Sequence, residues 1–194
     1  MNMQHLSDRE LISRYQLGEE QAFEELLTRH KNRIYTTILM FVKNRDEADD
    51  LFQDTFIKIV DILRSGRYND EGKFLPWALR VAYNLCVDQF RKAKRLPSIP
   101  NTEEFNLVNS SADSLDCRID FCMESQETIE SVRALVDKLP ADQREVVVLR
   151  HFSDLSFKEI ADMTEVSINT ALGRMRYALI NLRKMMEEQP AFTK

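Results

Sequence analysis

The sequence has few glycines and prolines, which interrupt helices and strands, and few cysteines, which could cross-link the chain. Among 194 residues there are four glycines, five prolines and three cysteines, against 43% hydrophobic and 30% charged residues. That composition is typical of a soluble, globular and largely helical protein. The cysteines, Cys86, Cys117 and Cys122, are odd in number and lack metal-ligand spacing, and the three histidines are scattered. We therefore expect reduced thiols and no metal site.

Long hydrophobic runs and catalytic signatures are missing as well. No apolar run approaches the ~18 residues of a membrane span, and residues 1–14 are polar, without the apolar core of a secretion signal. The chain contains no glycine-rich phosphate loop, no HExxH motif and no nucleophile elbow. We expect a cytoplasmic protein that is not inserted in a membrane, is not an enzyme, and uses no cofactor or small-molecule substrate.

The formal net charge of −5 conceals an uneven distribution of charge. Between Leu96 and Glu130 there are eight acidic residues and one arginine, whereas four of the five residues from Arg91 to Arg95 are basic. From Val166 to Met186 there are four basic residues and no acidic one. Because salt screens charges beyond roughly 8 Å, a nucleic acid responds to these local patches. The chain therefore carries two basic surfaces separated by an acidic segment.

Helical periodicity dominates the chain, and we find no convincing alternation of the kind that predicts strands. Two capping boxes, Ser7 with Glu10 and Ser156 with Glu159, predict helix starts, and Asp46 and Ser167 are candidate caps for two more. The expected helices cover roughly 8–17, 20–42, 46–63, 75–94, 128–138, 142–152, 157–163 and 168–187. The predicted fold is all-α, with two small helical domains at 1–95 and 125–187, a flexible acidic linker at 96–124 and a tail at 188–194.

The last two helices match a helix-turn-helix, with a short capped helix, a turn of about four residues and a longer capped helix. One face of the longer helix is apolar and can pack on the preceding helices. The opposite face and its flank are polar and basic: Asn169, Thr170, Gly173, Arg174, Arg176, Tyr177, Asn181, Arg183 and Lys184. Short hydrogen-bonding side chains there suit base edges, and the cations suit phosphates. The alternative is an ordinary helical hairpin with a solvated basic face.

The helix at 75–94 carries an aromatic residue at one end and cations along one side. Its polar side aligns Trp77, Arg80, Asn84, Asp88, Arg91 and Arg95, with Lys92 beside them, and Tyr68, Phe74 and Tyr83 add aromatics nearby. Stacking on an aromatic ring stabilises an unpaired base by ~1–3 kcal/mol, so this face suits a single strand of DNA. In the competing interpretation, the aromatics belong to the core and the cations only complement the end of a helix.

The helix at 46–63 has an acidic face. Asp49, Asp50, Gln53, Asp54, Ile57 and Asp61 share it. An exposed isoleucine among carboxylates indicates a protein interface. Acidic residues near a helix N-terminus can also be purely structural, and that alternative stays open.

Three segments, in this order, resemble an extracytoplasmic-function sigma factor, the minimal branch of the housekeeping-sigma family. Residues 46–56 (DEADDLFQDTF) look like the region 2 helix that binds the polymerase clamp. Residues 74–84 (FLPWALRVAYN) look like the segment that melts promoters and reads the −10 element. Residues 139–184 look like region 4, whose helix-turn-helix reads the −35 element.

The resemblance implies a division of labour among these segments. Asp49, Asp50, Gln53, Asp54 and Ile57 would contact core RNA polymerase. The loop from Tyr68 to Lys73 would receive a flipped base, and the face from Trp77 to Arg95 would hold the displaced strand. Ser167, Asn169, Thr170, Gly173, Arg174, Arg176, Tyr177 and Lys184 would bind −35 DNA. The acidic linker would run through the polymerase's active-site channel, and the family also implies an anti-sigma factor as a partner.

Two positions depart from the family's pattern. The turn of the helix-turn-helix usually has glycine where this chain has Glu165, so a left-handed backbone there would cost roughly 1–2 kcal/mol. The recognition helix often has lysine where this chain has Leu172, and Arg174 or Arg176 would then supply the missing phosphate contact.

Other kinds of protein share some of these features. A stand-alone helix-turn-helix regulator would explain the last helix but would leave the acidic face and the Trp77 helix unexplained. A helical adaptor that binds only protein, such as a sigma-sequestering factor, would not depend on Arg174.

Overall fold

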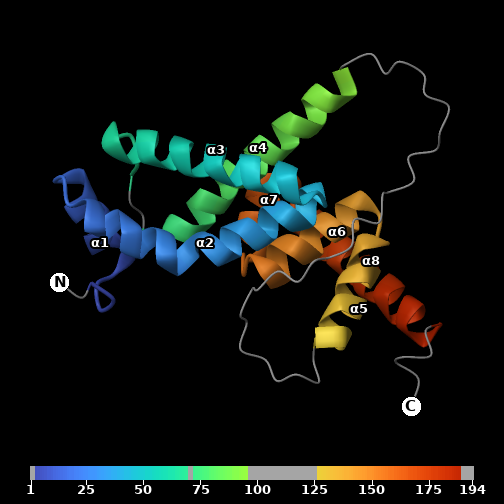
Figure 1. Cartoon of the computed structure of the whole chain (residues 1–194). Coiled ribbons are helices and arrows are strands. Elements are labelled where there is room, and N and C mark those ends of the chain that lie inside the picture. The colour runs from blue at the N-terminus through green and yellow to red at the C-terminus, as the bar shows by residue number, and fades with distance from the viewer. Residues whose placement is uncertain (1–2, 70–71, 96–125, 189–194) are drawn as a thin grey trace.

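The computed structural model describes residues 3–69, 72–95 and 126–188. The described chain is helical throughout and contains no strand, which confirms the all-α prediction (Figure 1). In chain order the helices are α1 (Asp8–Gln16), α2 (Glu20–Val42), α3 (Arg45–Arg64), α4 (Phe74–Arg95), α5 (Gln126–Asp137), α6 (Ala141–Val147), the π-helical segment η2 (Val148–Phe152), α7 (Phe157–Thr164) and α8 (Ile168–Glu187). The predicted linker at 96–124, with Cys117 and Cys122, lies outside the described residues.

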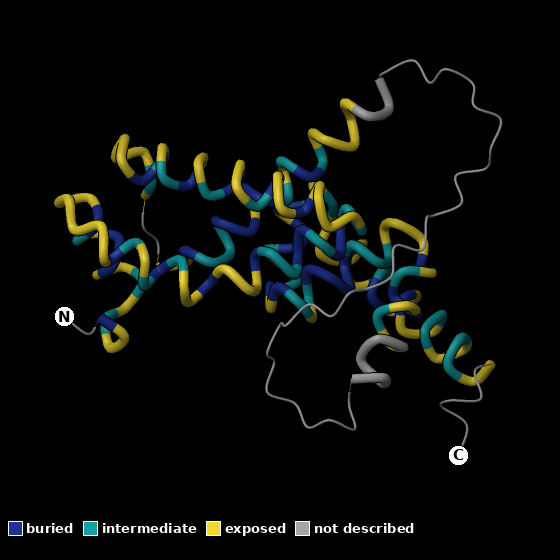
Figure 2. Tube along the Cα trace, viewed as in Figure 1, coloured by how far each residue is buried: buried dark blue, intermediate teal, exposed yellow. Residues whose placement is uncertain are grey.

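The N-terminal helices form one unit in which α2 contacts α1, α3 and α4, and α3 contacts α4. Their buried faces meet along the middle of this unit (Figure 2). Each helix supplies a stripe of apolar residues at helical spacing, as an amphipathic sequence requires. The most deeply buried of these side chains are Leu11, Ile12, Leu26, Ile34, Ile38, Ile59, Leu63 and Leu79.

Side-chain caps explain where α1, α3, α7 and α8 begin. The Ser7–Glu10 and Ser156–Glu159 capping boxes are both present, with reciprocal side-chain to backbone bonds. One predicted cap is wrong: Asn44 rather than Asp46 caps α3, with its Oδ1 accepting from the Glu47 amide at 3.1 Å. Asn and Asp cap almost equally well, so the apolar pattern alone could not choose between them.

The C-terminal helices form a second unit in which α5, α6 and α7 all pack on α8. The sequence predicted a single α-helix over residues 142–152, but the α-helical bonding pattern ends at Val147 and continues as the π-helical η2. The wider π turn brings Ser153 to a buried position, where its backbone amide donates to Val148 O. Glu165 has φ 56° and ψ 38°, so the backbone at this position, between α7 and α8, is left-handed. The cost that we expected for a residue other than glycine at this position therefore applies.

The two units are packed on each other in the structure. The buried residues form a continuous apolar cluster that runs from α1–α4 into α6–α8, and η2 lies against α2. Hydrogen bonds cross the junction as well, including one between the hydroxyls of Thr37 and Ser153 at 2.8 Å. We call this packing the closed arrangement. The sequence predicted the two units but not this contact between them.

Candidate functional site

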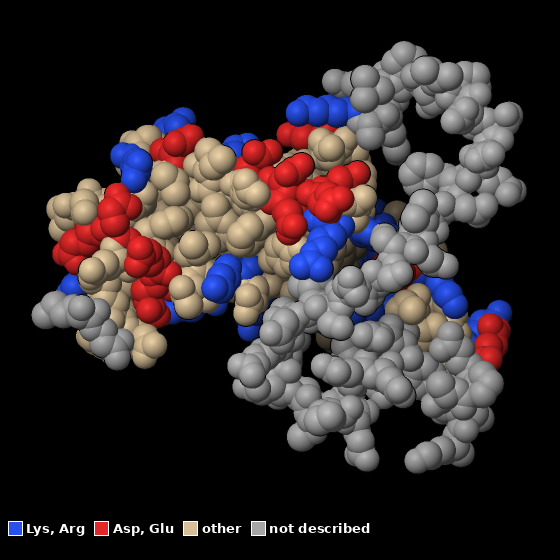
Figure 3. Space-filling model, in the orientation of Figure 1, with Lys and Arg blue, Asp and Glu red and all other residues tan. Residues whose placement is uncertain are grey.

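The acidic face of α3 is exposed. Figure 3 shows carboxylates gathered over the N-terminal half of this helix, and Asp49, Asp50, Gln53 and Asp54 are all exposed. Ile57 stands among them with 60% of its surface exposed. An isoleucine held in water beside carboxylates is suited to a contact with a partner that offers both apolar surface and cations.

One of these carboxylates already has a partner within the chain. The Tyr35 hydroxyl donates to Asp49 Oδ1 at 2.7 Å. Burial raises the pKa of Tyr35, and the bond to Asp49 raises it further, so the phenol stays protonated. Asp49 is therefore held in one orientation, while Asp50 and Asp54 lie on the same exposed face.

An aromatic cluster occupies the junction between α3 and α4. The rings of Tyr68 and Trp77 are 4.5 Å apart between centroids, and Phe74 lies 5.8 Å from Trp77. Phe74 is buried, whereas Tyr68 and Trp77 are only half-buried. Each of the two interpretations of the aromatics therefore fits some of them. Phe74 belongs to the core, whereas Tyr68 and Trp77 retain exposed surface on which a base could stack.

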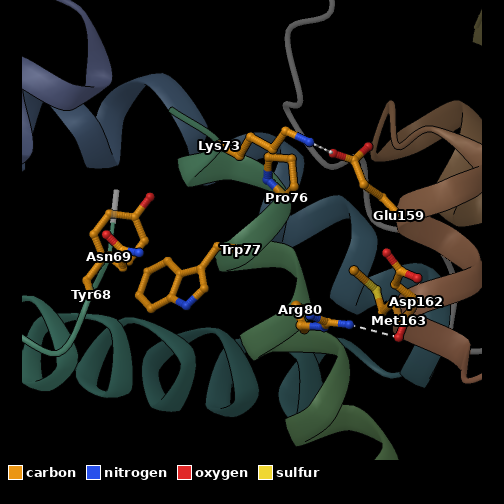
Figure 4. A pocket seen from close by; sticks show the side chains of 9 residues that line it. All are labelled: Tyr68, Asn69, Lys73, Pro76, Trp77, Arg80, Glu159, Asp162 and Met163. Carbon is orange, nitrogen blue, oxygen red and sulfur yellow. Dashed lines mark hydrogen bonds and ion pairs between the residues drawn. The ribbon is translucent and has the colours of Figure 1, made fainter. Parts of the chain in front are cut away.

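A cavity of about 270 Å³ opens beside this cluster. Figure 4 shows Tyr68 and Asn69 on one side, Trp77 and Arg80 from α4 along the floor, and residues of α7 opposite. Its lining consists of Tyr68, Asn69, Lys73, Pro76, Trp77, Arg80, Glu159, Asp162 and Met163. Because the last three belong to the C-terminal unit, the cavity has this shape only in the closed arrangement.

The cations of the cavity are engaged across the junction. Arg80 donates to the backbone carbonyl of Asp162 at 2.8 Å, and Lys73 Nζ lies 3.5 Å from Glu159 Oε1. Burial opposes ionisation of Glu159, but its hydrogen bonds from Ser156 outweigh burial, and Lys73 adds to them, so the pKa of Glu159 is lowered. Two of the predicted DNA-binding cations thus contact the C-terminal unit here.

The remaining predicted residues of α4 lie beyond the junction. Asn84, Arg91 and Lys92 are exposed, and Arg91 lies 3.7 Å from Asp88 one turn away. Arg95 ends the helix, and its side chain lies outside the description. The structure thus leaves a basic end on α4, clear of the cavity.

The N-terminal turn of α8 is organised by its cap. The Ser167 hydroxyl accepts from the Thr170 amide at 3.0 Å and pairs with the Thr170 hydroxyl at 2.8 Å. Both predicted DNA-binding hydroxyls therefore hold the turn together. Asn169, Arg176, Tyr177 and Lys184 are exposed along the helix, as their predicted role requires.

Arg174 does not point freely into solvent. Its guanidinium lies 3.4 Å from Glu145 Oε2 and 3.6 Å from Asp142 Oδ2, both in α6. The Tyr83 hydroxyl of α4 donates to the other oxygen of Glu145 at 2.7 Å. Burial raises the pKa of Glu145, although the bond from Tyr83 and the charge of Arg174 oppose that rise. Arg174 therefore belongs to a network that joins the two units.

Sequence reasoning missed Glu145, Thr37 and Ser153, which form contacts across the junction. It also missed Asp142, which contacts Arg174 within the C-terminal unit. Neither charge pattern nor periodicity distinguishes them from ordinary surface residues, because their partners lie far along the chain. Within the described residues, no group of three or more His, Cys, Asp or Glu is placed to hold a metal. None of the described helices is both long and apolar enough to cross a membrane.

Comparison with known proteins identifies both units. Residues 26–96 match the family model described as Sigma-70 region 2, and residues 129–178 match Sigma-70, region 4. The RNA polymerase sigma-H factor of Pseudomonas aeruginosa is 28% identical over 87% of this chain and 88% of its own. CarQ of Myxococcus xanthus, an RNA polymerase sigma factor, is 29% identical over 91% and 96%.

Two solved structures share the fold. CnrH, in complex with the cytosolic domain of CnrY, superposes with a TM-score of 0.65 at 22% identity, covering 94% of this chain and 98% of CnrH. The sigma factor RpoE of Bartonella quintana, in complex with the anti-sigma factor NepR, gives 0.63 at 21% identity, covering 85% and 96%. At this identity the likeness is one of architecture.

Proposed function

The chain belongs to the extracytoplasmic-function branch of the sigma-70 family of RNA polymerase sigma factors, and from that premise we propose how its surfaces divide the work of initiation. The protein binds core RNA polymerase and directs transcription from specific promoters. The observation that carries the proposal is the order of three surfaces on one chain: an acidic face on α3, an aromatic and basic face on α4, and a basic face on α8.

The acidic face of α3 is proposed to bind the polymerase. Charge reversal by Asp50→Lys with Asp54→Lys should prevent co-purification with core polymerase, because both carboxylates are exposed on this face and a like-charge contact opposes association. Glu187→Lys with Glu188→Lys makes the same charge change at exposed positions at the far end of α8, and this control should co-purify normally. Equal recovery of both double variants would contradict the assignment.

The junction of α3 and α4 is proposed to act on melted −10 DNA. Tyr68 and Trp77 would stack on unpaired bases, and Arg80, Asn84, Arg91, Lys92 and Arg95 would follow the strand. Capturing a base out of the stack costs a few kcal/mol, which stacking at ~1–3 kcal/mol per base can offset. Lys73, in the adjoining loop, supplies a further cation.

The basic face of α8 is proposed to read the −35 element. Arg176 offers the better test than Arg174, because Arg176 is exposed whereas Arg174 is bound to Asp142 and Glu145. Arg176→Glu should abolish −35-dependent initiation and leave core binding intact. Lys31→Glu, the same charge change at an exposed site on α2, should leave both intact. If Arg176→Glu initiated as strongly as the unaltered chain on promoters that need a −35 element, the proposal would be contradicted.

The closed arrangement does not permit both elements to be read together. The names of the −10 and −35 elements place them 25 base pairs apart, about 85 Å of duplex. In the closed arrangement Glu145 of α6 contacts both Tyr83 of α4 and Arg174 of α8. Two successive helix packings therefore separate α4 from α8, a distance of about 20 Å. We infer that the units separate on the polymerase. Residues 96–125 have a covalent reach of up to about 100 Å, which is sufficient.

Several finer assignments follow from the family. We propose that the chain acts in the cytoplasm, catalyses no reaction of its own and needs no cofactor. The acidic segment at 96–124 would run through the polymerase's active-site channel, where its charge resembles that of nucleic acid. An anti-sigma factor is proposed as a further partner, by analogy with the RpoE complex.

The deciding experiment is transcription in vitro with core polymerase on genomic fragments, followed by mapping of start sites. Initiation at defined sites that requires this chain is the expected result. Tight binding of the isolated chain to duplex DNA, with no stimulation of the polymerase, would instead identify a stand-alone regulator.

A further inference from the structure

Two large apolar side chains stand exposed at the start of α8. Ile168 and Leu172 expose 44% and 43% of their surface. They are four residues apart, so they lie on one face of the helix, one turn apart. Neither is needed for the core, because Ala171, Met175 and Ala178 form the buried stripe of this helix. Their exposure therefore calls for an explanation outside the fold of the unit.

The charges around this pair favour DNA over an apolar protein partner. No acidic residue occurs from Val166 to Met186. Arg176, one turn beyond Leu172, is exposed, and Arg183 is exposed farther along the same helix. Cations flanking an apolar pair fit a major groove, in which phosphates line both edges and base edges form the floor.

A leucine or an isoleucine can donate no hydrogen bond to a base. The feature of the major groove that an apolar side chain recognises is the 5-methyl group of thymine. We propose that Ile168 and Leu172 set the specificity of the −35 contact by packing on thymine methyl groups. This inference rests on the proposed reading of the −35 element by α8 and adds which bases it selects.

The spacing of the pair restricts where the thymines lie. Four residues of α-helix rise about 6 Å, close to two base-pair steps of 3.4 Å. The two methyl groups should therefore fall within three consecutive base pairs of the −35 element. Arg176 would add phosphate contacts that position the helix without selecting a base.

The test uses the holoenzyme assembled from core polymerase and the full chain. A promoter library with eight randomised base pairs at the −35 position is first selected for binding. Each thymine in the selected sequence is then replaced by deoxyuridine, which removes only the methyl group. We expect replacement at two positions within a three-base-pair window to weaken holoenzyme binding about fourfold each, the effect of one buried methyl group.

A matched pair of variants identifies the side chain responsible. Leu172→Ala should bind the thymine probe more weakly and become insensitive to deoxyuridine at one of the two positions. Leu179→Ala removes another exposed leucine of the same helix, 51% exposed and about two turns away, and should keep the full sensitivity. The deoxyuridine measurement on the unaltered chain needs no variant, so poor folding of Leu172→Ala would leave the test intact.

The outcomes separate the two proposals. If no −35 sequence is selected, the reading of DNA by α8 is wrong. If a sequence is selected but deoxyuridine is neutral at every thymine, or the window contains none, −35 recognition stands and thymine recognition is overturned. Unchanged DNA binding by Leu172→Ala would also overturn it.

Discussion

A disulfide across the junction should hold the two units together and stop initiation. Thr37 of α2 and Ser153, after η2, are each 1% exposed, and their Oγ atoms are 2.8 Å apart. Replacing both with cysteine places two sulfurs within bonding reach at little change in volume. Cys86 can remain, because burial raises the pKa of its thiol to about 12 and keeps it unreactive. Cys117 and Cys122 would be replaced by serine.

The size of the effect follows from the geometry of the closed arrangement. The bond closes a loop of somewhat over 100 residues, for which chain entropy stabilises the folded form by about 4–5 kcal/mol. The bonded units also cannot move about 85 Å apart, the distance between the two promoter elements. The oxidised protein should therefore unfold at a higher temperature while losing −35-dependent initiation almost completely.

The assay is transcription in vitro with core polymerase, before and after reduction. Cross-linking is verified by electrophoresis without reductant, and dithiothreitol should restore activity. The single variants Thr37→Cys and Ser153→Cys carry the same substitutions without the bond, and both should be active under oxidising conditions. Full −35-dependent activity of completely cross-linked protein would refute the inference that the units must separate.

Three further changes test individual contacts. Glu165→Gly should raise the melting temperature by about 2–4 °C, because it relieves about 1 kcal/mol of strain in the left-handed backbone. Glu165→Ala should give no such gain. Thermal unfolding followed by circular dichroism measures both. Tyr83→Phe removes the donor to the partly buried Glu145 carboxylate, which should cost the closed arrangement about 1–2 kcal/mol. Energy transfer between dyes on the two units should fall as a result, and unchanged transfer would count against the network. Hydrogen bonding to His30, opposed by burial, lowers the pKa of Asp8. The ionised Asp8 carboxylate therefore stabilises the folded protein above about pH 4, and this contribution is lost as the pH falls through the lowered pKa. The difference in unfolding free energy between the wild type and Asp8→Asn, from urea titrations, should therefore shrink toward zero in acid, and a constant difference would contradict this.

Sequence patterns predicted the helices and the exposed faces well, because both depend on neighbours close in the chain. The capping boxes at Ser7 and Ser156 each involve residues three positions apart, so the helix starts could be recognised directly. The failure at Asp46 has the same origin: Asn44 and Asp46 both have capping side chains, and only the backbone geometry selects Asn44. The π turn at Val148 has no signature in composition or periodicity.

The candidate site divides in the same way. The exposed acidic face of α3 and the exposed cations of α8 follow from helical periodicity, which sorts residues between inside and outside. The contacts of Arg174, Arg80 and Lys73 could not be predicted from periodicity, because each of these side chains contacts a residue in a different helix. Their functional roles remain predictions.

The sequence alone therefore determined the helical class, the division into two units and the charge of each surface. The local pattern of polar and apolar residues decides which side of a helix faces water. Only the tertiary structure showed that the units share one core and that Tyr83, Glu145 and Arg174 join them. Such contacts bring together residues 29 and 62 positions apart. They depend on how whole helices pack against one another, and no local pattern in the sequence records that packing.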